Sequence, residues 1–122
     1  SVLYHIAAIE IDYLYADLLR QPFPEQIVAL FPFEVREENG SLTPVLGFEQ
    51  EWYRERLDTV RAHVIDVFRA MDEDDYRRAR HLTDYPIDIT PEWAAYHLVE
   101  HEAEHRGELA SLRTRAEHAT RT

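Results

Sequence analysis

The strongest constraint on the fold is an apolar period of three and four residues that runs through residues 48–71. The side chains that recur at this spacing are Tyr53, Leu57, Val60, Val64, Val67 and Met71. Residues three or four apart lie on one face of an α-helix. A heptad-like stripe of this length is typical of a helix that packs against another helix. The pattern therefore predicts a long helix with a helical neighbour.

Two further segments have the same period. Residues 1–20 are expected to form a helix that ends before Pro22, because proline lacks an amide donor and disfavours helix at the preceding residue. Its stripe passes through Val2, Ile6, Ile9, Tyr13 and Ala16. A third helix is expected to begin with Thr90 as N-cap and Pro91 at its first position, and to end near residue 119. Its stripe contains Ala94, Leu98, Leu109 and Leu112.

The segments between these helices are expected to be connections. Residues 21–47 are rich in proline and glycine and predict a long loop, with a short helical turn near residues 25–31. Residues 72–76 predict a turn or short helix, and residues 81–89 a connector. Since no segment predicts a strand, we expect an all-α up-down helical bundle that forms a single domain over residues 1–122. Three helices make a thin bundle, and bundles of this kind usually close with a fourth helix.

The charge balance excludes several classes of partner. The chain has 24 acidic and 13 basic residues, a net charge of -11 and no lysine. Proteins that bind nucleic acid neutralise phosphates with clustered Lys or Arg, so we expect no nucleic-acid partner. No apolar run reaches the roughly 18 residues of a membrane span, so we expect no membrane partner and a cytoplasmic location. Cysteine is absent, which excludes a cysteine nucleophile and thiolate ligands from the chain.

Three histidines lie four residues apart in the third predicted helix, at His97, His101 and His105. Side chains at i and i+4 lie above one another on one face, so an adjacent pair can hold one metal ion. Only His101 and His105 continue the apolar stripe, whereas His97 lies beside it. A buried imidazole without a partner costs roughly 1–3 kcal/mol, and one metal ion would satisfy both rings. The alternative is that solvent or carboxylates bind these histidines.

Residues 101–105 also match the H-E-x-x-H pattern of zinc peptidases, in which the glutamate polarises a metal-bound water. In the metzincin extension a glycine follows the second histidine by three residues, whereas Gly107 follows His105 by two. The chain ends soon after His118, which leaves no later helix for a third ligand, and no strand is predicted that could hold a peptide. A metallopeptidase is therefore the least favoured interpretation.

The stretch His101-Glu102-x-x-His105-Arg106-Gly107-Glu108-Leu109 resembles the H-E-x-x-H-R-G-Q signature on the last helix of DinB-like (damage-inducible) four-helix-bundle proteins. The segment that begins Tyr4-His5 is similar to the family's other landmark, a histidine in its second helix followed by an acidic residue and an aromatic. This resemblance covers nearly the whole chain and implies metal ligation by His5, His101 and His105. It also implies an N-terminally incomplete domain, because the family's first helix would precede His5. Glu108 stands where the family usually has glutamine.

Three histidine ligands leave an open coordination position, as catalytic metal sites do, and imidazole suits both Zn and Ni. Relatives of the DinB-like family include enzymes that use mycothiol or bacillithiol. The resemblance therefore implies a divalent-metal-dependent transferase, isomerase or hydrolase that uses a low-molecular-weight thiol and acts on a small molecule. The alternative is a non-catalytic metal-binding oligomeric bundle. We expect a homodimer, because an incomplete bundle exposes its apolar stripe.

Three polar residues near the histidines have open roles. Glu102 lies about 100° around the helix from His101, so we expect it to support the ligands from behind or to face solvent. Glu10 either orients His5 or lies on a solvated helix face. Arg106 either attracts an anionic substrate or pairs with Glu102 or Glu10.

Overall fold

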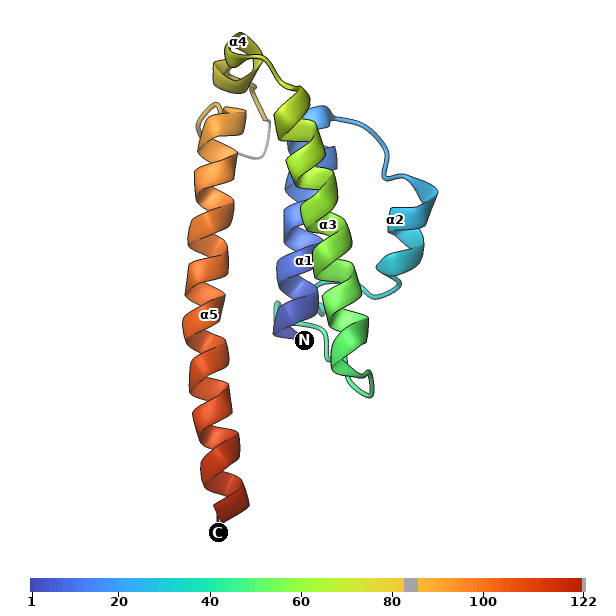
Figure 1. Ribbon diagram of the computed structural model, residues 1–122, viewed down its shortest axis with the longest axis vertical. Helices are drawn as coiled ribbons and strands as arrows, with labels where there is room; N and C mark the ends of the chain where they lie inside the picture. Colours follow the sequence, from blue (N-terminus) through green and yellow to red (C-terminus); the bar gives the residue numbers. More distant parts are fainter. Residues whose placement is uncertain (83–85, 122) are drawn as a thin grey trace.

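The computed structural model describes residues 1–82 and 86–121, and its long elements are helices (Figure 1). Helix α1, Val2–Asp12, continues without a break into the π-helical segment η1, Tyr13–Leu19. The other two long helices are α3, Gln50–Ala70, and α5, Pro91–Arg121. Helices α1 and α3 run in the same direction, and α5 runs antiparallel to both (Figure 1). The described part of the chain has no strand beyond two isolated bridges, so the prediction of an all-α bundle is confirmed.

Two short helices lie in the connections, as predicted. Helix α2, Glu25–Leu30, interrupts the long segment between η1 and α3, and α4, Glu73–Arg77, follows α3. Residues 83–85 of the predicted connector lie outside the described residues.

The helix ends follow from capping groups in the sequence. The Thr90 hydroxyl accepts a hydrogen bond of 2.9 Å from the backbone N–H of Trp93, which confirms the predicted N-cap of α5. At the other end of the first long helix, Arg20 takes a left-handed conformation with φ 51°. The N–H of Gln21 then donates to the carbonyl of Tyr15 at 2.9 Å. This left-handed cap ends the helix before the first proline is reached.

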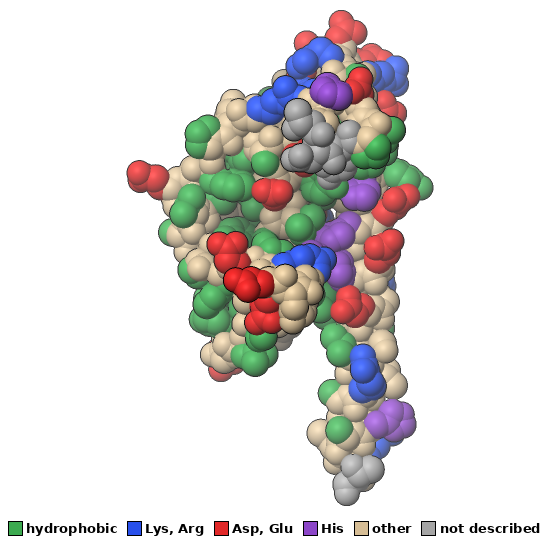
Figure 2. Space-filling model, turned by 180° about the vertical axis from the view of Figure 1, so that it is seen from behind, with side chains coloured by type: hydrophobic (Ala, Val, Ile, Leu, Met, Phe, Trp, Pro, Cys, Tyr) green, Lys and Arg blue, Asp and Glu red, His purple; other side chains and the backbone are tan. Residues whose placement is uncertain are grey.

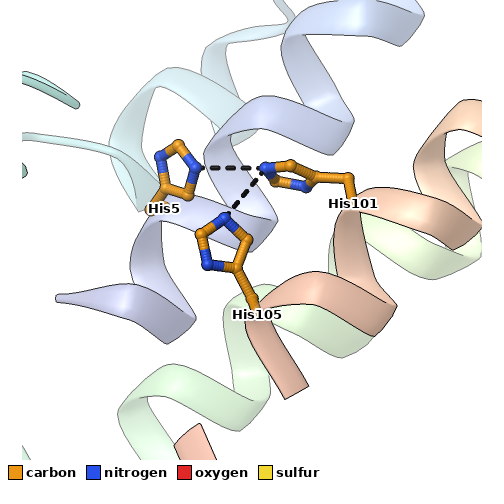
Figure 3. A group of neighbouring side chains, drawn as sticks. All are labelled: His5, His101 and His105. Atoms are coloured by element: carbon orange, nitrogen blue, oxygen red, sulfur yellow. Dashed lines mark hydrogen bonds between the residues drawn. The ribbon is translucent and has the colours of Figure 1, made fainter. Parts of the chain in front are cut away.

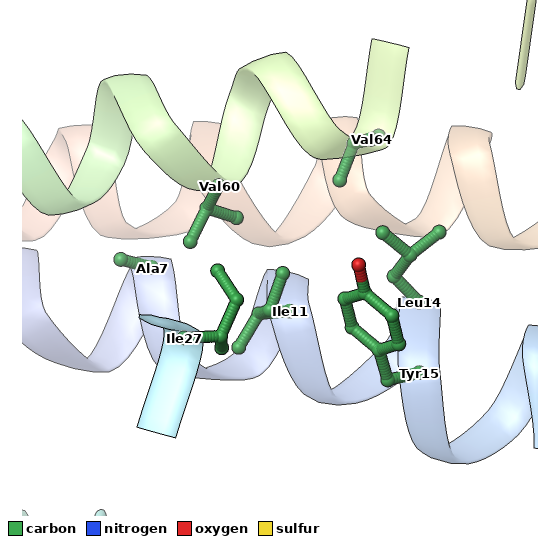
Figure 4. Close-up of a cluster of buried hydrophobic side chains, with 7 residues drawn as sticks. All are labelled: Ala7, Ile11, Leu14, Tyr15, Ile27, Val60 and Val64. Carbon is green, nitrogen blue, oxygen red and sulfur yellow. The ribbon is translucent and has the colours of Figure 1, made fainter. Parts of the chain in front are cut away.

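Helix α1 is the centre of the core because it contacts both α3 and α5. Figure 4 shows its main cluster, in which side chains of α1 and η1 meet those of α2 and α3. The cluster consists of Ala7, Ile11, Leu14, Tyr15, Ile27, Val60 and Val64. Val60 and Val64 belong to the stripe predicted for α3, so that part of the prediction is confirmed.

The stripe predicted for the first helix is wrong in part. Ile9 and Tyr13 are only half-buried and Ala16 is exposed. The buried line passes instead through Tyr4, Ala7, Ile11, Leu14 and Leu18. Because two helices cover α1 from different sides, apolar residues occur around most of its circumference. The period then reveals a helix without locating its innermost face.

Helix α5 is covered along only part of its length. Ala94 and Leu98 are buried, whereas Leu109 is half-buried and Leu112 is 41% exposed. Residues 106–121 are here called the α5 extension, and their C-terminal part projects beyond the rest of the molecule (Figures 1 and 2). The apolar stripe predicted for this helix therefore continues past the part that the bundle covers. Among the described helices, none has both the length and the apolar character that a bilayer crossing requires.

An ion network with one buried member, Glu10, ties the three long helices together. The Glu10 side chain on α1 is 5% exposed, and its Oε1 accepts a hydrogen bond of 2.7 Å from Nη2 of Arg61 on α3. The same Nη2 donates to Oε2 of Glu102 on α5 at 2.6 Å. Burial raises the pKa of the Glu10 carboxyl, and the bond to Arg61 opposes this effect. Arg61 thus supplies the charge that allows a carboxylate in the core.

We expect the substitution Arg61→Met to lower the free energy of unfolding by about 2 kcal/mol, because it leaves a buried carboxylate without its counter-charge. Urea unfolding monitored by circular dichroism measures the loss. The double variant Arg61→Met/Glu10→Gln should recover much of it. Arg113→Met, which removes an exposed pair with Glu117, is the control and should change stability by less than about 0.5 kcal/mol. Equal effects of Arg61→Met and Arg113→Met would contradict the role of the network.

Candidate metal centre

The structure brings three histidines from the two ends of the chain together. His5 lies on the first turns of α1 and is 4% exposed. His101 and His105 lie on successive turns of α5 and are half-buried. Figure 3 shows the three rings facing one another across the contact between α1 and α5. The sequence spacing that places His101 and His105 on one face therefore aims both of them at His5.

The ring nitrogens have the separations of a metal-ligand set. The distance between Nε2 of His5 and Nε2 of His101 is 3.1 Å, and that between Nε2 of His105 and Nε2 of His101 is 3.2 Å. One ligand atom from each residue lies within 4.8 Å of the other two. Tetrahedral ligands at about 2.0–2.1 Å from a zinc ion are about 3.3 Å from one another. Two of the three separations therefore match those of ligands on one metal ion, and the three histidines could hold such an ion.

The number of hydrogen bonds that the ring nitrogens can form also favours a metal ion between the three histidines. Nε2 of His101 is the atom that both other rings approach. A neutral imidazole nitrogen carries either one proton or one lone pair in the ring plane, so it forms one good hydrogen bond there. Hydrogen bonding among the three rings consequently leaves one of the two contacts unsatisfied. A cation between the rings would instead accept a lone pair from all three.

Glu108 orients one of these rings. Its Oε2 lies 2.8 Å from Nδ1 of His105, one turn earlier on α5. When Nδ1–H donates to this carboxylate, the lone pair of His105 remains on Nε2, which faces the other two histidines. Sequence reasoning noted Glu108 only as a substitution for glutamine and missed this contact. The spacing of three residues from His105 was the signal that could have revealed it.

The electrostatics keep His5 and His101 in the form that binds metals. Burial, together with the neighbouring His101 and His105, lowers the pKa of His5 to about 4. Burial also lowers the pKa of His101, with His105 as the next cause. Both rings are consequently neutral at neutral pH, and neutral imidazole is the ligand form of histidine.

The remaining polar candidates do not join the cluster. His97 stacks on Trp93 with ring centroids 4.7 Å apart and an interplanar angle of 9°, so it is a packing residue. Glu102 binds Arg61, as described above, and faces α3. Glu10 neither orients His5 nor lies on a solvated face, since it is buried against the same arginine. One of the two roles left open for Arg106 was to pair with Glu102 or Glu10. The structure pairs both glutamates with Arg61, which sequence reasoning missed.

We expect Glu108→Ala to weaken the binding of Co²⁺ or Zn²⁺ by about 10–100-fold, because it removes the acceptor that fixes the His105 tautomer. Glu108→Gln should retain most of the affinity, since its amide oxygen can accept the same hydrogen bond. Competition with a chromophoric chelator gives the dissociation constants. Glu117→Ala, on the exposed part of the same helix, is the control. If Glu108→Ala and Glu117→Ala bound metal equally well, the orienting role would be disproved.

The pKa of His5 also predicts how the stability of the metal-free protein depends on pH. Below the ordinary pKa of 6.5, the unfolded chain takes up a proton that folded His5 accepts only near pH 4. The free energy of unfolding should therefore fall as the pH drops from 6.5 towards 4, by up to about 3 kcal/mol, and the contribution of His5 should be constant above 6.5.

Urea unfolding with a chelator present, at a series of pH values, measures this dependence. His5→Leu should flatten the slope between pH 6.5 and 4, whereas the exposed control His118→Leu should leave it unchanged. An unaltered slope in His5→Leu would show that this ring is not the group responsible.

Comparison with known proteins adds one finding to this geometry. A family model described as the DinB superfamily matches residues 1–109. No curated protein and no solved structure gives a significant match. The match covers α1, α3 and the histidine-bearing part of α5, and it agrees with the all-helical architecture. The chain therefore belongs to the DinB superfamily.

Proposed function

We propose that this protein is an enzyme that binds a divalent metal ion, zinc or nickel, at His5, His101 and His105, and that it activates a low-molecular-weight thiol for reaction with a small molecule. The observation that supports the proposal is the convergence of three imidazole nitrogens within 4.8 Å. Within the described residues, no carboxylate and no fourth histidine joins this group. A metal ion held by three protein ligands keeps a coordination position for an exogenous molecule.

The chain's own groups define what the site contributes. A bound divalent ion lowers the pKa of a coordinated thiol or water. The three neutral imidazoles hold that ion, and Glu108 keeps the His105 ring in its ligating tautomer. Because the chain has no cysteine, a sulfur nucleophile has to arrive with a cofactor. The thiol itself is inferred from the DinB-like resemblance.

A cavity beside α1 is suited to a small substrate. It has a volume of about 510 Å³ and lies between α1 and the segment that carries α2. Ile9, one helical turn after His5, lines it together with Phe31, Phe33 and Arg36. Ligand pockets for small molecules typically measure about 300–1,000 Å³ and are mostly apolar. The long connection between η1 and α3 therefore forms much of the wall of this cavity, and none of the three histidines lines it.

The position of Glu102 argues against peptidase chemistry. In H-E-x-x-H peptidases the glutamate acts on a metal-bound water. Here the Glu102 carboxylate binds Arg61 on α3 at 2.6 Å, so it is engaged with another helix and not with the histidine cluster. A metal-activated thiol, which does not require Glu102 as a base, agrees better with this geometry.

The test uses cobalt-loaded protein, because Co²⁺ replaces zinc and has visible absorption bands. We expect one Co²⁺ per chain, a change in these bands when N-acetylcysteine is added, and faster formation of the thioether between this thiol and 1-chloro-2,4-dinitrobenzene. In that reaction the sulfur–carbon bond forms, chloride leaves with the electrons of the carbon–chlorine bond, and the thiol proton passes to the buffer.

His105→Ala should lose at least tenfold in metal affinity together with the rate enhancement, whereas the exposed control His118→Ala should keep both. Undiminished metal binding by His105→Ala would remove the ligand assignment. Metal binding without any spectral response to the thiol would overturn the thiol proposal. A response without turnover would favour a non-catalytic metal-binding bundle.

A further inference from the structure

A basic pocket lies at the end of the molecule that carries α4. It has a volume of about 350 Å³ and is formed by the last turn of η1 and the connection that follows α4. Its lining includes Arg20, Arg78, Arg80 and His81, and none of the described lining residues is acidic. This composition is unusual in a chain that has 24 acidic and 13 basic residues. Figure 2 shows basic side chains gathered at this end of the molecule.

Arg80 fixes one wall of the pocket. Its side chain is 8% exposed, and its Nη1 donates hydrogen bonds to the backbone carbonyls of Asp75 and Arg78. Its Nη2 donates to Oδ1 of Asp75 at 2.9 Å. The backbone N–H and carbonyl of Arg80 pair with those of Ile89. The connection is therefore held in place without a ligand, which lowers the entropic cost of binding one.

Arg20 and Arg78 keep most of their donors free for a ligand. A guanidinium group has five N–H donors. In the described part of the chain, Arg20 donates from Nη2 to the carbonyl of His81. Arg78 donates from Nη2 to Oδ1 of Asp75 at 2.8 Å. Both side chains are exposed, so the remaining donors are accessible to a small molecule in the pocket.

The pocket stays positively charged when the carboxylates bonded to its lining are counted. Asp75 binds both arginines of the connection, and Asp88 lies 2.8 Å from Nδ1 of His81. These two carboxylates balance two of the three guanidinium groups. Arg20 pairs with no carboxylate of the described residues. The pocket therefore keeps at least one net positive charge, which attracts an anion.

The backbone at Arg20 is a second indication that this side chain has a function. Its φ of 51° lies in the left-handed region, and no other residue of the described chain except glycine has a positive φ. Glycine is the usual residue in a left-handed helix cap, because a side chain is crowded there. An unfavourable conformation of this kind is retained where the side chain has a role. Here the side chain links η1 to the carbonyl of His81 on the other side of the pocket.

We propose that this pocket binds a phosphate group, with Arg20 and Arg78 as its ligands. A carboxylate can be satisfied by one guanidinium group, whereas phosphate has further oxygen atoms that a second one can bind. The volume of about 350 Å³ is within the range of small-molecule pockets, so it has room for the organic part of a phosphate monoester.

The phosphate site is separate from the candidate metal centre. Arg20 follows the C-terminal end of η1, whereas His5 lies on the first turns of α1. At 1.5 Å per residue the two positions are about 20 Å apart along the helix. None of the residues that line the pocket belongs to α3 or α5, so it also lies apart from the face between those helices. The proposal is independent of metal binding and of the proposed function.

Isothermal titration calorimetry of the metal-free chain with glycerol 3-phosphate, at low ionic strength, tests the site. We expect one molecule bound per chain, and we expect Arg20→Gly and Arg78→Gln each to weaken binding at least tenfold. Glycine adopts the left-handed conformation readily, so circular dichroism should show that Arg20→Gly remains folded. The control is Arg115→Gln, which removes one positive charge from the exposed α5 extension and should leave the affinity unchanged. No binding by the wild-type chain, or equal binding by Arg20→Gly, would overturn the proposal.

Further titrations with inorganic phosphate and with acetate identify the ligand. Tighter binding of glycerol 3-phosphate than of inorganic phosphate would assign the site to phosphate monoesters, and equal binding would assign it to the free ion. Acetate that binds as tightly as either would disprove a phosphate site. Amide shifts in ¹H–¹⁵N spectra should change at Arg20 and at residues 78–81 when phosphate is added. Changes confined to the three histidines of the candidate metal centre would also contradict the proposal.

Discussion

The structure depends on the burial of polar groups on both sides of α1. His5 and Glu10 are both nearly inaccessible to solvent, and burying a polar group is costly unless it finds a partner. α5 provides a partner on each side: the two histidines meet His5, and Glu102 meets Glu10 through Arg61. Sliding α5 by one turn, about 5.4 Å, would break both sets of contacts together. The two polar groups therefore fix the register of α5 against α1 more strictly than apolar contacts could.

The same turn of α5 serves two purposes because neighbouring residues point in different directions. His101 and His105 face α1, while Glu102 faces Arg61 on α3. In a zinc peptidase these three positions serve one reaction. Here the glutamate belongs to the network that holds the helices together, and the histidines alone form the candidate metal site. A sequence pattern thus has different chemical meanings according to which neighbouring helix each residue faces.

Much of the fold and of the candidate site could be predicted from the sequence. Helices give periodic sequence patterns. The sequence therefore predicted the three long helices, the Thr90 cap and the shared face of His101 and His105. The predicted metal-ligand set that includes His5 came from the family resemblance, because a contact across 96 residues has no local signature. Arg61 was missed for the same reason, since many arginines in this chain are potential partners of a glutamate. The innermost face of α1 was misplaced because two helices cover it.

Glu108 stands where the family usually has glutamine, and this difference affects how strongly Nε2 of His105 can donate electrons to a metal ion. A carboxylate accepts a hydrogen bond from Nδ1–H of His105 more strongly than the amide of the usual glutamine would. The imidazole consequently becomes a better electron donor at Nε2. Three neutral histidines contribute no charge, so the carboxylate 2.8 Å from the ring is the nearest negative group bonded to this set. Stronger donation holds a divalent ion more firmly but leaves it less acidic towards its remaining ligand. A thiol, which is already far more acidic than water, requires less acidity from the metal, and in this respect Glu108 suits thiol activation better than the activation of water.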